Sequence, residues 1–494
     1  MEAALSQTRR SGMWTGLWHR SRVTRQGPYA LRLLPSTALH PTLTYRADRA
    51  HGTNAPLPGT PDNNLPPPPS RVEYNIIEEV EPLVRYTAGG YYPMRIGDRL
   101  SSSRYHVIHK LGYGSFSTIW LARDEHLHRY VALKIAVSER NDRVESNILR
   151  CLQDNEAHSE QRDSGNELIP NILDAFEVEG PSIHGSRAKH HCIVTTPARA
   201  TLSGAREASY NSPFKPEVAH AIAAQLVQAV ALIHSRGVIH ADLHEGNILV
   251  HLPSSIDNLS VDELYNVYAP PYLEPIKRTD GLPLDPWVPS HGVVPVWFQC
   301  QSDTLPLAEA SIFLNDFGES WCPTVNKPST TRTPYILRSP ELLLDMNAPV
   351  SFSSEIWSLA CAIFHVMGAR PLFDAWASSE YYVVREQVAL LGALPEHLWD
   401  LWENREMLDS ERVQSLNEVK PRSLEDHLEH SVQIPRRAEG TTVMTEEEKQ
   451  DFFKLLGSML TYRIEDRPTA QQVLEADWVQ NWALPALEAR SKCE

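Results

Sequence analysis

Three short segments in the first half of the chain are rich in apolar residues and predict strands. They are residues 105–111 (YHVIHKL), 130–135 (YVALKI) and 191–194 (HCIV). The first alternates apolar and polar side chains, as a strand with one buried face does. Gly112 and Gly114 follow it and favour a hairpin. The pattern therefore predicts a small β-rich region.

Helical spacing appears once within this β-rich region and dominates after it. Ile148, Leu149 and Leu152 lie three, four and seven positions after Glu145, so one helix has an apolar face with Glu145 at its inner edge. Later helices are predicted at residues 216–235, 354–364 and 469–479. We therefore expect an α+β fold whose larger second part is mainly helical.

The most apolar long segment, residues 218–233, is interrupted by His220, Gln225 and Gln228. No uninterrupted apolar run has the length that crosses a bilayer. We read this segment as a core helix and expect no membrane partner.

Three regions differ in composition from the rest of the chain. Up to Arg49 there are eight arginines and two acidic residues, which fits a mitochondrial transit peptide or a basic disordered tail equally well. Residues 59–69 (GTPDNNLPPPP) have the composition of a linker. Residues 252–308 are rich in proline and lack clear periodicity, so we read them as an insert with a short helix at 260–267.

The formal charge of −16 argues against nucleic-acid binding and is compatible with a basic protein partner or with simple solubility. The six cysteines show no C-x-x-C spacing and are typical of reduced thiols in an intracellular protein.

The segment 236–250 (RGVIHADLHEGNILV) carries the strongest candidate chemistry. A carboxylate such as Asp242 can orient an attacking hydroxyl and accept its proton, while the amide oxygen of Asn247 can bind Mg²⁺. His244 lies between them and is a third candidate catalytic residue.

Further motifs stand in order on both sides of this segment. The hairpin residues Gly112, Gly114, Ser115 and Ser117 are expected to approach phosphates through backbone amides, with Ser117 at a position that is often a third glycine. Lys134, in V-A-L-K, would contact the α- and β-phosphates and pair with Glu145.

Residues 195–198 would form a hinge, where the backbone of Thr196 and Ala198 meets adenine and Thr195 lies behind it. Asp316, in D-F-G, would hold Mg²⁺. Glu341, in S-P-E, needs a guanidinium partner when buried, and Arg467 is the candidate.

Together these motifs resemble those of eukaryotic protein kinases over residues 100–480. Within that family the chain is similar to the fungal SR-protein kinases, through Gly89–Pro93 (GGYYP), Ile96–Asp98, Arg104–Ile108 and Gly114–Leu121. The resemblance implies a bilobal fold, ATP with Mg²⁺ as cofactors, and transfer to serine in Arg/Ser-rich protein substrates. It also suggests cytoplasm and nucleus, whereas the basic N-terminus suggests the mitochondrion. We expect a monomer.

We expect four regions from this comparison. They are a basic region (1–71), an N-terminal lobe with an extension (72–196), a C-terminal lobe containing the insert (197–482) and a tail (483–494).

Three residues depart from the kinase pattern. Ala241 replaces the arginine of H-R-D, so activity should not require phosphorylation of the activation loop. His244 replaces a lysine that contacts the transferring phosphate, which should lower the rate. Glu355 replaces an aspartate, and its longer side chain should shift the support of the catalytic loop.

Two other functions stay open. A small-molecule phosphotransferase has a similar H-x-D-L-H-x-x-N loop but lacks the S-P-E platform, and a pseudokinase scaffold would bind partners without turnover. A metal site at 189–192 is disfavoured, because consecutive residues of a strand cannot all face one ion. Acidic groups at 446–448 and 409–411 would dock an arginine-rich peptide or form a solvated surface.

Overall fold

The computed structural model describes residues 72–493 except 141–142, 155–167, 184–185, 211, 323–324, 326–330, 346, 375–378, 403–415 and 417–418. The basic N-terminal region, the linker at 59–69 and the acidic group at 409–411 therefore lie outside the described residues.

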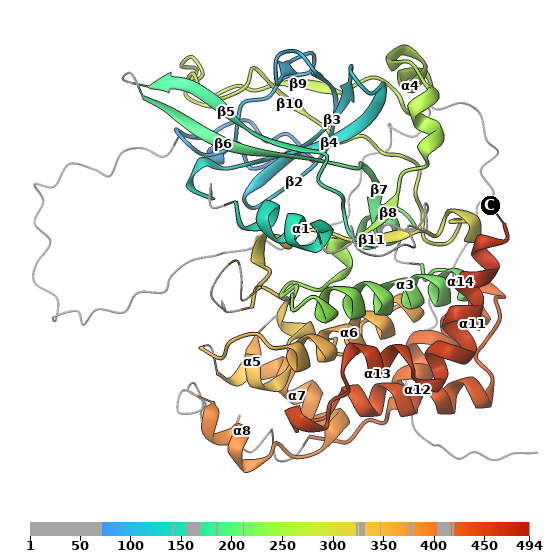
Figure 1. Ribbon diagram of the computed structural model, residues 1–494. Coiled ribbons are helices and arrows are strands. Elements are labelled where there is room, and N and C mark those ends of the chain that lie inside the picture. Colours follow the sequence, from blue (N-terminus) through green and yellow to red (C-terminus); the bar gives the residue numbers. More distant parts are fainter. Residues whose placement is uncertain are drawn as a thin grey trace, which may run out of the picture. The chain divides into compact units, whose positions relative to one another are not determined.

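The N-terminal lobe is built on an antiparallel sheet with strand order β1-β2-β3-β4-β6-β5 (Figure 1). Its strands are β1 (Arg99–Leu100), β2 (Tyr105–Gly114), β3 (Ser117–Asp124), β4 (Arg129–Ala136), β5 (Asp174–Ile183) and β6 (Ser186–Thr195). All three predicted strands are present. Helix α1 (Val144–Asp154) buries Ile148, Leu149 and Leu152, which confirms the predicted apolar face.

The C-terminal lobe is mainly helical and is built around α3 (Pro216–Ser235), which packs against α6 (Phe352–Met367) (Figure 1). Helix α3 is long and apolar enough to span a membrane by composition, but 72% of its most apolar window is buried inside the fold. It is therefore a core helix, as predicted. The other helices are α2 (Leu202–Glu207), α5 (Pro340–Leu344), α7 (Glu380–Leu391), α8 (Glu396–Leu401), α10 (Leu424–Leu428), α11 (Ile434–Glu439), α12 (Glu446–Met459) and α13 (Ala470–Leu474).

The last helix differs from the prediction. The segment 469–479 is not one helix, because α13 ends at Leu474 and a turn of π-helix, Val479–Ala483, begins only at the last residue of the segment. The expected tail at 483–494 instead begins with helix α14 (Leu484–Ser491), which packs on α3. Its Leu487 and Arg490 are buried, so the tail prediction is wrong for this segment. Two inward-facing residues in eight are too short a pattern to recognise from the sequence.

A three-stranded sheet, in the order β11-β8-β7, supports the segments that carry the candidate chemistry. Its strands are β7 (Ala198–Thr201), β8 (Ile248–His251) and β11 (Ile312–Leu314). The segment 236–247 enters β8, and D-F-G leaves β11. Because β8 and β11 are paired, the two segments lie at the same edge of the sheet.

The insert at 252–308 lies elsewhere than we expected. We assigned it to the C-terminal lobe, but most of it packs on the N-terminal sheet (Figure 1), while Cys300 and Leu305 near its end join the buried cluster of α3 and α6. The predicted short helix is α4 (Val261–Tyr268), and Leu264 on it is buried with Ile108 and Leu121. The insert follows β8 directly in the chain, but this position does not reveal which lobe its apolar side chains cover.

The insert also forms a hairpin that covers the chain before β1. Strand β9 (Leu273–Pro275) pairs with β10 (His291–Val293). Beside them, Ile276 and Val288 bury against Ile77 and Val80. The extension at 72–98 is therefore held between the insert and the sheet.

Candidate active site

Glu355 of α6 binds two backbone amides of the catalytic loop. Its Oε1 accepts the backbone N–H of Ala241 at 2.8 Å, and its Oε2 accepts that of His240 at 3.1 Å. His234 lies 2.7 Å from the same Oε2. Burial disfavours the charge, but the bond to His234 and nearby donors hold the pKa of Glu355 below its ordinary value. The longer side chain thus reaches both amides.

His240 connects the catalytic loop to D-F-G. Its Nδ1 accepts the N–H of Asp242 at 3.3 Å, so its Nε2 is the nitrogen that donates to the carbonyl of Asn315 at 2.8 Å. Its ring packs edge-on against Phe317, with centroids 4.9 Å apart. This pairing fixes the loop relative to Asp316.

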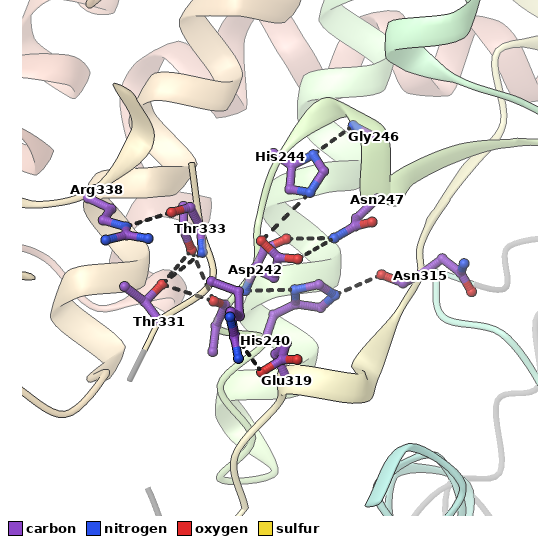
Figure 2. Close-up of polar contacts among 12 residues, drawn as sticks. His240, Asp242, His244, Gly246, Asn247, Asn315, Glu319, Thr331, Thr333 and Arg338 are labelled. Atoms are coloured by element: carbon purple, nitrogen blue, oxygen red, sulfur yellow. Dashed lines mark hydrogen bonds and ion pairs between the residues drawn. The ribbon is translucent and has the colours of Figure 1, made fainter. Parts of the chain in front are cut away.

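Asp242 and Asn247 face each other, as Figure 2 shows. Nδ2 of Asn247 donates to the carbonyl oxygen of Asp242 at 2.9 Å and to its Oδ2 at 3.2 Å. Oδ1 of Asp242 is buried and has no hydrogen-bond partner among the described residues. A buried acceptor that makes no hydrogen bond within the protein can accept one from a substrate hydroxyl.

His244 lies beside the same carboxylate (Figure 2). Its Nδ1 accepts the backbone N–H of Gly246 at 3.0 Å, so Nε2 carries the proton in the neutral ring. That nitrogen lies 3.6 Å from Oδ1 of Asp242. A Cβ at Gly246 would approach the His244 ring within 2.7 Å, so the turn requires glycine.

Lys134 on β4 connects two carboxylates. Its Nζ lies 2.7 Å from Oε1 of Glu145 and 2.8 Å from Oδ1 of Asp316. Burial disfavours the ammonium charge, but the two carboxylates raise the pKa of Lys134, so it stays charged. Phe317 shares the buried cluster of Ile148 on α1, which brings the helix close enough for this pair.

The glycine-rich hairpin lies in register with Lys134. Gly112 pairs with Ile119, and Ile119 pairs with Lys134, so the three residues form one row across β2, β3 and β4. A Cβ at Gly112 would meet nothing within 4 Å. Ser115 lies in the turn, and Ser117 opens β3 opposite Gly114. The open backbone beside a fixed cation fits a phosphate chain.

The predicted hinge segment lies between the two sheets. Strand β6 ends at Thr195, which pairs with Ala132, and β7 begins at Ala198. Thr196 is one of two residues that join them. The adenine contact expected of Thr196 and Ala198 stays a prediction.

The residues that could hold Mg²⁺ are Asn247 and Asp316. Both bonds of Asn247 use Nδ2, so its amide oxygen is the atom that suits a hard cation. The described residues contain no cluster of three or more His, Cys, Asp or Glu side chains that would hold a metal on their own. His190 contacts the Ala136 carbonyl and His191 contacts Ser146, so the alternative at 189–192 is a pair of structural histidines.

Two threonines that the sequence analysis did not single out join the activation segment to the catalytic loop (Figure 2). Thr331 and Thr333 both donate their hydroxyls to the carbonyl of Ala241, each at 3.0 Å. Ala241 has a φ of +65°, which turns this carbonyl toward them. Their position between D-F-G and S-P-E is the sequence feature that could have identified them.

The predicted ion pair between Glu341 of S-P-E and Arg467 lies beyond this segment. Arg467 contacts Glu341 in a bidentate way, at 2.7 and 2.9 Å, and both side chains are buried. The partner of Glu341 is therefore the one expected from the sequence.

Comparison with known proteins agrees with this geometry. The protein kinase domain model matches residues 105–257 and 306–479, and the unmatched stretch between them coincides with the insert. A serine/threonine protein kinase of Aspergillus fumigatus is 29% identical over 414 residues, which are 81% of this chain and 90% of that protein.

Similarity to SR-protein kinases is partial. SRSF protein kinase 3 of Mus musculus is 34% identical over 179 residues, which are 35% of this chain and 30% of that protein. Protein kinase dsk1 of Schizosaccharomyces pombe is 34% identical over 167 residues, 33% of this chain and 30% of that protein.

The family match covers well over half of the chain and includes the catalytic loop, Lys134 and D-F-G. The chain therefore belongs to the protein kinase family and is a serine/threonine protein kinase.

Proposed function

We propose that the protein transfers the γ-phosphate of ATP to serine in Arg/Ser-rich protein substrates. The observation that carries the transfer step is the buried Oδ1 of Asp242, which makes no hydrogen bond among the described residues and has Nε2 of His244 3.6 Å away. The carboxylate that bears it is oriented by Asn247 through Oδ2. An acceptor that is fixed but unused is suited to receive a hydroxyl proton.

The other residues have separate roles in this proposal. Lys134 holds the α- and β-phosphates, and Glu145 keeps the ammonium in place. Asn247 and Asp316 would hold Mg²⁺, which supplies charge neutralisation for the phosphates. His244 places its Nε2–H beside the acceptor carboxylate and stands where a lysine usually contacts the transferring group.

Preference for arginine rests on the partial similarity to proteins named SRSF protein kinase 3 and dsk1. The net charge of −16 is compatible with a basic peptide. Of the acidic groups considered for docking, Glu446 and Glu447 are exposed at the start of α12, whereas Glu448 is buried against His220. Within 446–448, the first two glutamates are therefore the ones available to a peptide.

The test is phosphate transfer from labelled ATP with Mg²⁺ to an Arg-Ser-repeat peptide. A Lys-Ser-repeat peptide and the Asp242→Asn protein serve as controls, since the amide keeps the shape of Asp242 but cannot accept the proton. We expect transfer to the Arg-Ser peptide alone and its loss in the variant.

Equal transfer to both peptides would contradict the arginine preference and leave the kinase activity in place. ATP binding without transfer to either peptide or to a general acceptor protein would contradict the catalytic assignment and favour the scaffold function. Transfer to a small hydroxylated molecule but to no peptide would favour the small-molecule alternative.

A further inference from the structure

The segment before β1 contacts the glycine-rich hairpin directly. Tyr91, within the GGYYP motif, donates its hydroxyl to the carbonyl of Gly114 at 2.8 Å. Burial raises the pKa of Tyr91, although Arg85 opposes the shift, so the hydroxyl stays protonated and available as a donor. Gly114 is the second glycine of the hairpin expected to bind phosphates.

A second contact reaches the tip of the same hairpin. The guanidinium of Arg85 lies 5.5 Å from the ring centroid of Phe116 and 5.1 Å from that of Tyr91. A cation between two aromatic faces is attracted to both. Arg85 thus links Phe116, at the turn, to the tyrosine that contacts Gly114.

The geometry of the GGYYP motif explains how Tyr91 reaches this place. Gly89 has a φ of +85°, which favours glycine. At Gly90 a Cβ would lie 2.1 Å from the carbonyl oxygen of Arg85, so no larger residue fits. The two glycines fold the chain back on Arg85, and Tyr91 then donates its backbone N–H to that carbonyl at 3.1 Å.

The segment is anchored to the strand that leads into the hairpin. Glu81 is buried and contacts Nζ of Lys110 on β2, and the hydroxyl of Tyr86 donates to the same carboxylate. Lys110 is fully buried and lies two residues before Gly112. The anchor and the contact to Gly114 therefore lie on either side of the first glycine.

The opposite side of the segment is covered by the insert. Asn75 donates its backbone N–H to the carbonyl of Lys277 at 2.9 Å. A Cβ added at Gly292 would lie 3.2 Å from the side chain of Ile77, so the two segments are closely packed there. Close packing on both sides limits the movement of the segment.

We propose that residues 81–91 position the glycine-rich hairpin for ATP, with Tyr91 and Arg85 as the positioning residues. A hairpin of glycines is conformationally free, and binding a nucleotide requires it to become ordered. The two contacts order it before the nucleotide arrives. The inference rests on the proposed ATP site but not on the identity of the protein substrate.

The test compares Tyr91→Phe with Tyr92→Phe, which removes a hydroxyl from the next residue. Tyr92 packs edge-on against His190, away from the hairpin, and is the matched control. A lost hydrogen bond of about 1 kcal/mol corresponds to about a fivefold change in affinity. We expect Tyr91→Phe to raise the Kd and KM for ATP about fivefold, with kcat at saturating ATP and the KM for peptide near wild-type values.

Arg85→Gln should raise the KM for ATP as well, and Arg85→Lys should restore part of the loss because it keeps the cation. Thermal unfolding of all four variants separates this effect from a loss of folding. Tyr91→Phe with an unchanged Kd for ATP would overturn the proposal, as would an equal loss in Tyr92→Phe. Because ATP binding is measured directly, failure of peptide phosphorylation in the wild type would contradict the proposed function without affecting this result.

Discussion

His244 holds its Nε2 3.6 Å from Oδ1 of Asp242 and has its other ring nitrogen occupied by the N–H of Gly246. In the neutral ring the backbone bond therefore leaves the proton on Nε2, directed at the carboxylate. In this form the side chain offers a dipole where most kinases offer a full positive charge.

The first prediction concerns this substitution. His244→Lys should raise kcat about tenfold, because an ammonium stabilises negative charge on a transferring phosphate better than a neutral imidazole does. His244→Ala should lower kcat below wild type. Steady-state kinetics at saturating ATP measure both. A lysine variant no faster than wild type would show that the imidazole is adapted to this site.

The ion pair of Lys134 leads to the second prediction. Glu145→Gln should lower kcat about tenfold, because the ammonium loses one of its two carboxylates and shifts toward Asp316. Lys134→Met should lower kcat further, by about a hundredfold, since it also leaves the carboxylates of Glu145 and Asp316 facing each other. Glu139→Gln, at an exposed glutamate near α1, is the matched control. Equal kcat values for Glu145→Gln and wild type would show that the ion pair does not contribute to catalysis.

The third prediction concerns regulation. Ala241 provides no cation for a phosphate, and the activation segment reaches its carbonyl through Thr331 and Thr333 instead. Activity should therefore stay within about twofold of its starting value after phosphatase treatment. Loss of activity on dephosphorylation would contradict this expectation.

The same contacts predict an effect of mutation. Thr331→Val removes a hydroxyl that donates to the catalytic loop and accepts the backbone N–H of Thr333. It should lower kcat at least about fivefold, since one lost neutral hydrogen bond corresponds to about 1 kcal/mol. Thr442→Val, at an exposed threonine before α12, should leave kcat unchanged. If the two variants behave alike, the hydroxyl contact has no influence on the loop.

The sequence predicted the parts of the site that depend on local pattern. The strand containing Lys134, the helix carrying Glu145 and the order of Asp242, Asn247 and Asp316 are all readable from short motifs. The contact between Glu341 and Arg467 was also predictable, because a buried carboxylate in a known motif needs a guanidinium.

Contacts between distant segments could not be predicted in this way. Lys110 lies in an alternating strand and reads as an exposed residue, yet it is buried against Glu81, 29 positions earlier. Nothing in the composition of the insert indicates that it covers the N-terminal extension. The two backbone amides that Glu355 binds could not be identified from the sequence either, because α6 and the catalytic loop are more than 100 positions apart.

Glu355 gives a further prediction, on pH. Its folded pKa lies below the ordinary value of 4.5, so the ionised form is favoured by folding. Its contribution to the free energy of unfolding should be complete above about pH 4.5 and disappear as the pH falls through the folded pKa. Glu355→Gln should cost about 2–3 kcal/mol at pH 7, since a buried charged acceptor is lost.

Denaturant unfolding of wild type and Glu355→Gln at several pH values measures this difference. The gap between the two proteins should be constant from pH 7 to pH 5 and should narrow below pH 4.5. A gap that widens on acidification would mean that the carboxyl is protonated in the folded protein.

The last prediction concerns the buried pair of Glu81 and Lys110. Glu81→Gln should lower the free energy of unfolding, because it leaves the buried amine of Lys110, whose pKa burial lowers to about 7, without its counter-charge. The loss should be about 3–5 kcal/mol well below pH 7 and smaller above it, where the amine is neutral. The double variant Glu81→Gln with Lys110→Met should recover most of that loss, since an apolar chain of similar length needs no partner. Denaturant unfolding of the two single variants and the double variant gives the coupling energy. Additive losses would show that the two side chains act independently, and the extension would then be held mainly by its apolar contacts with the insert.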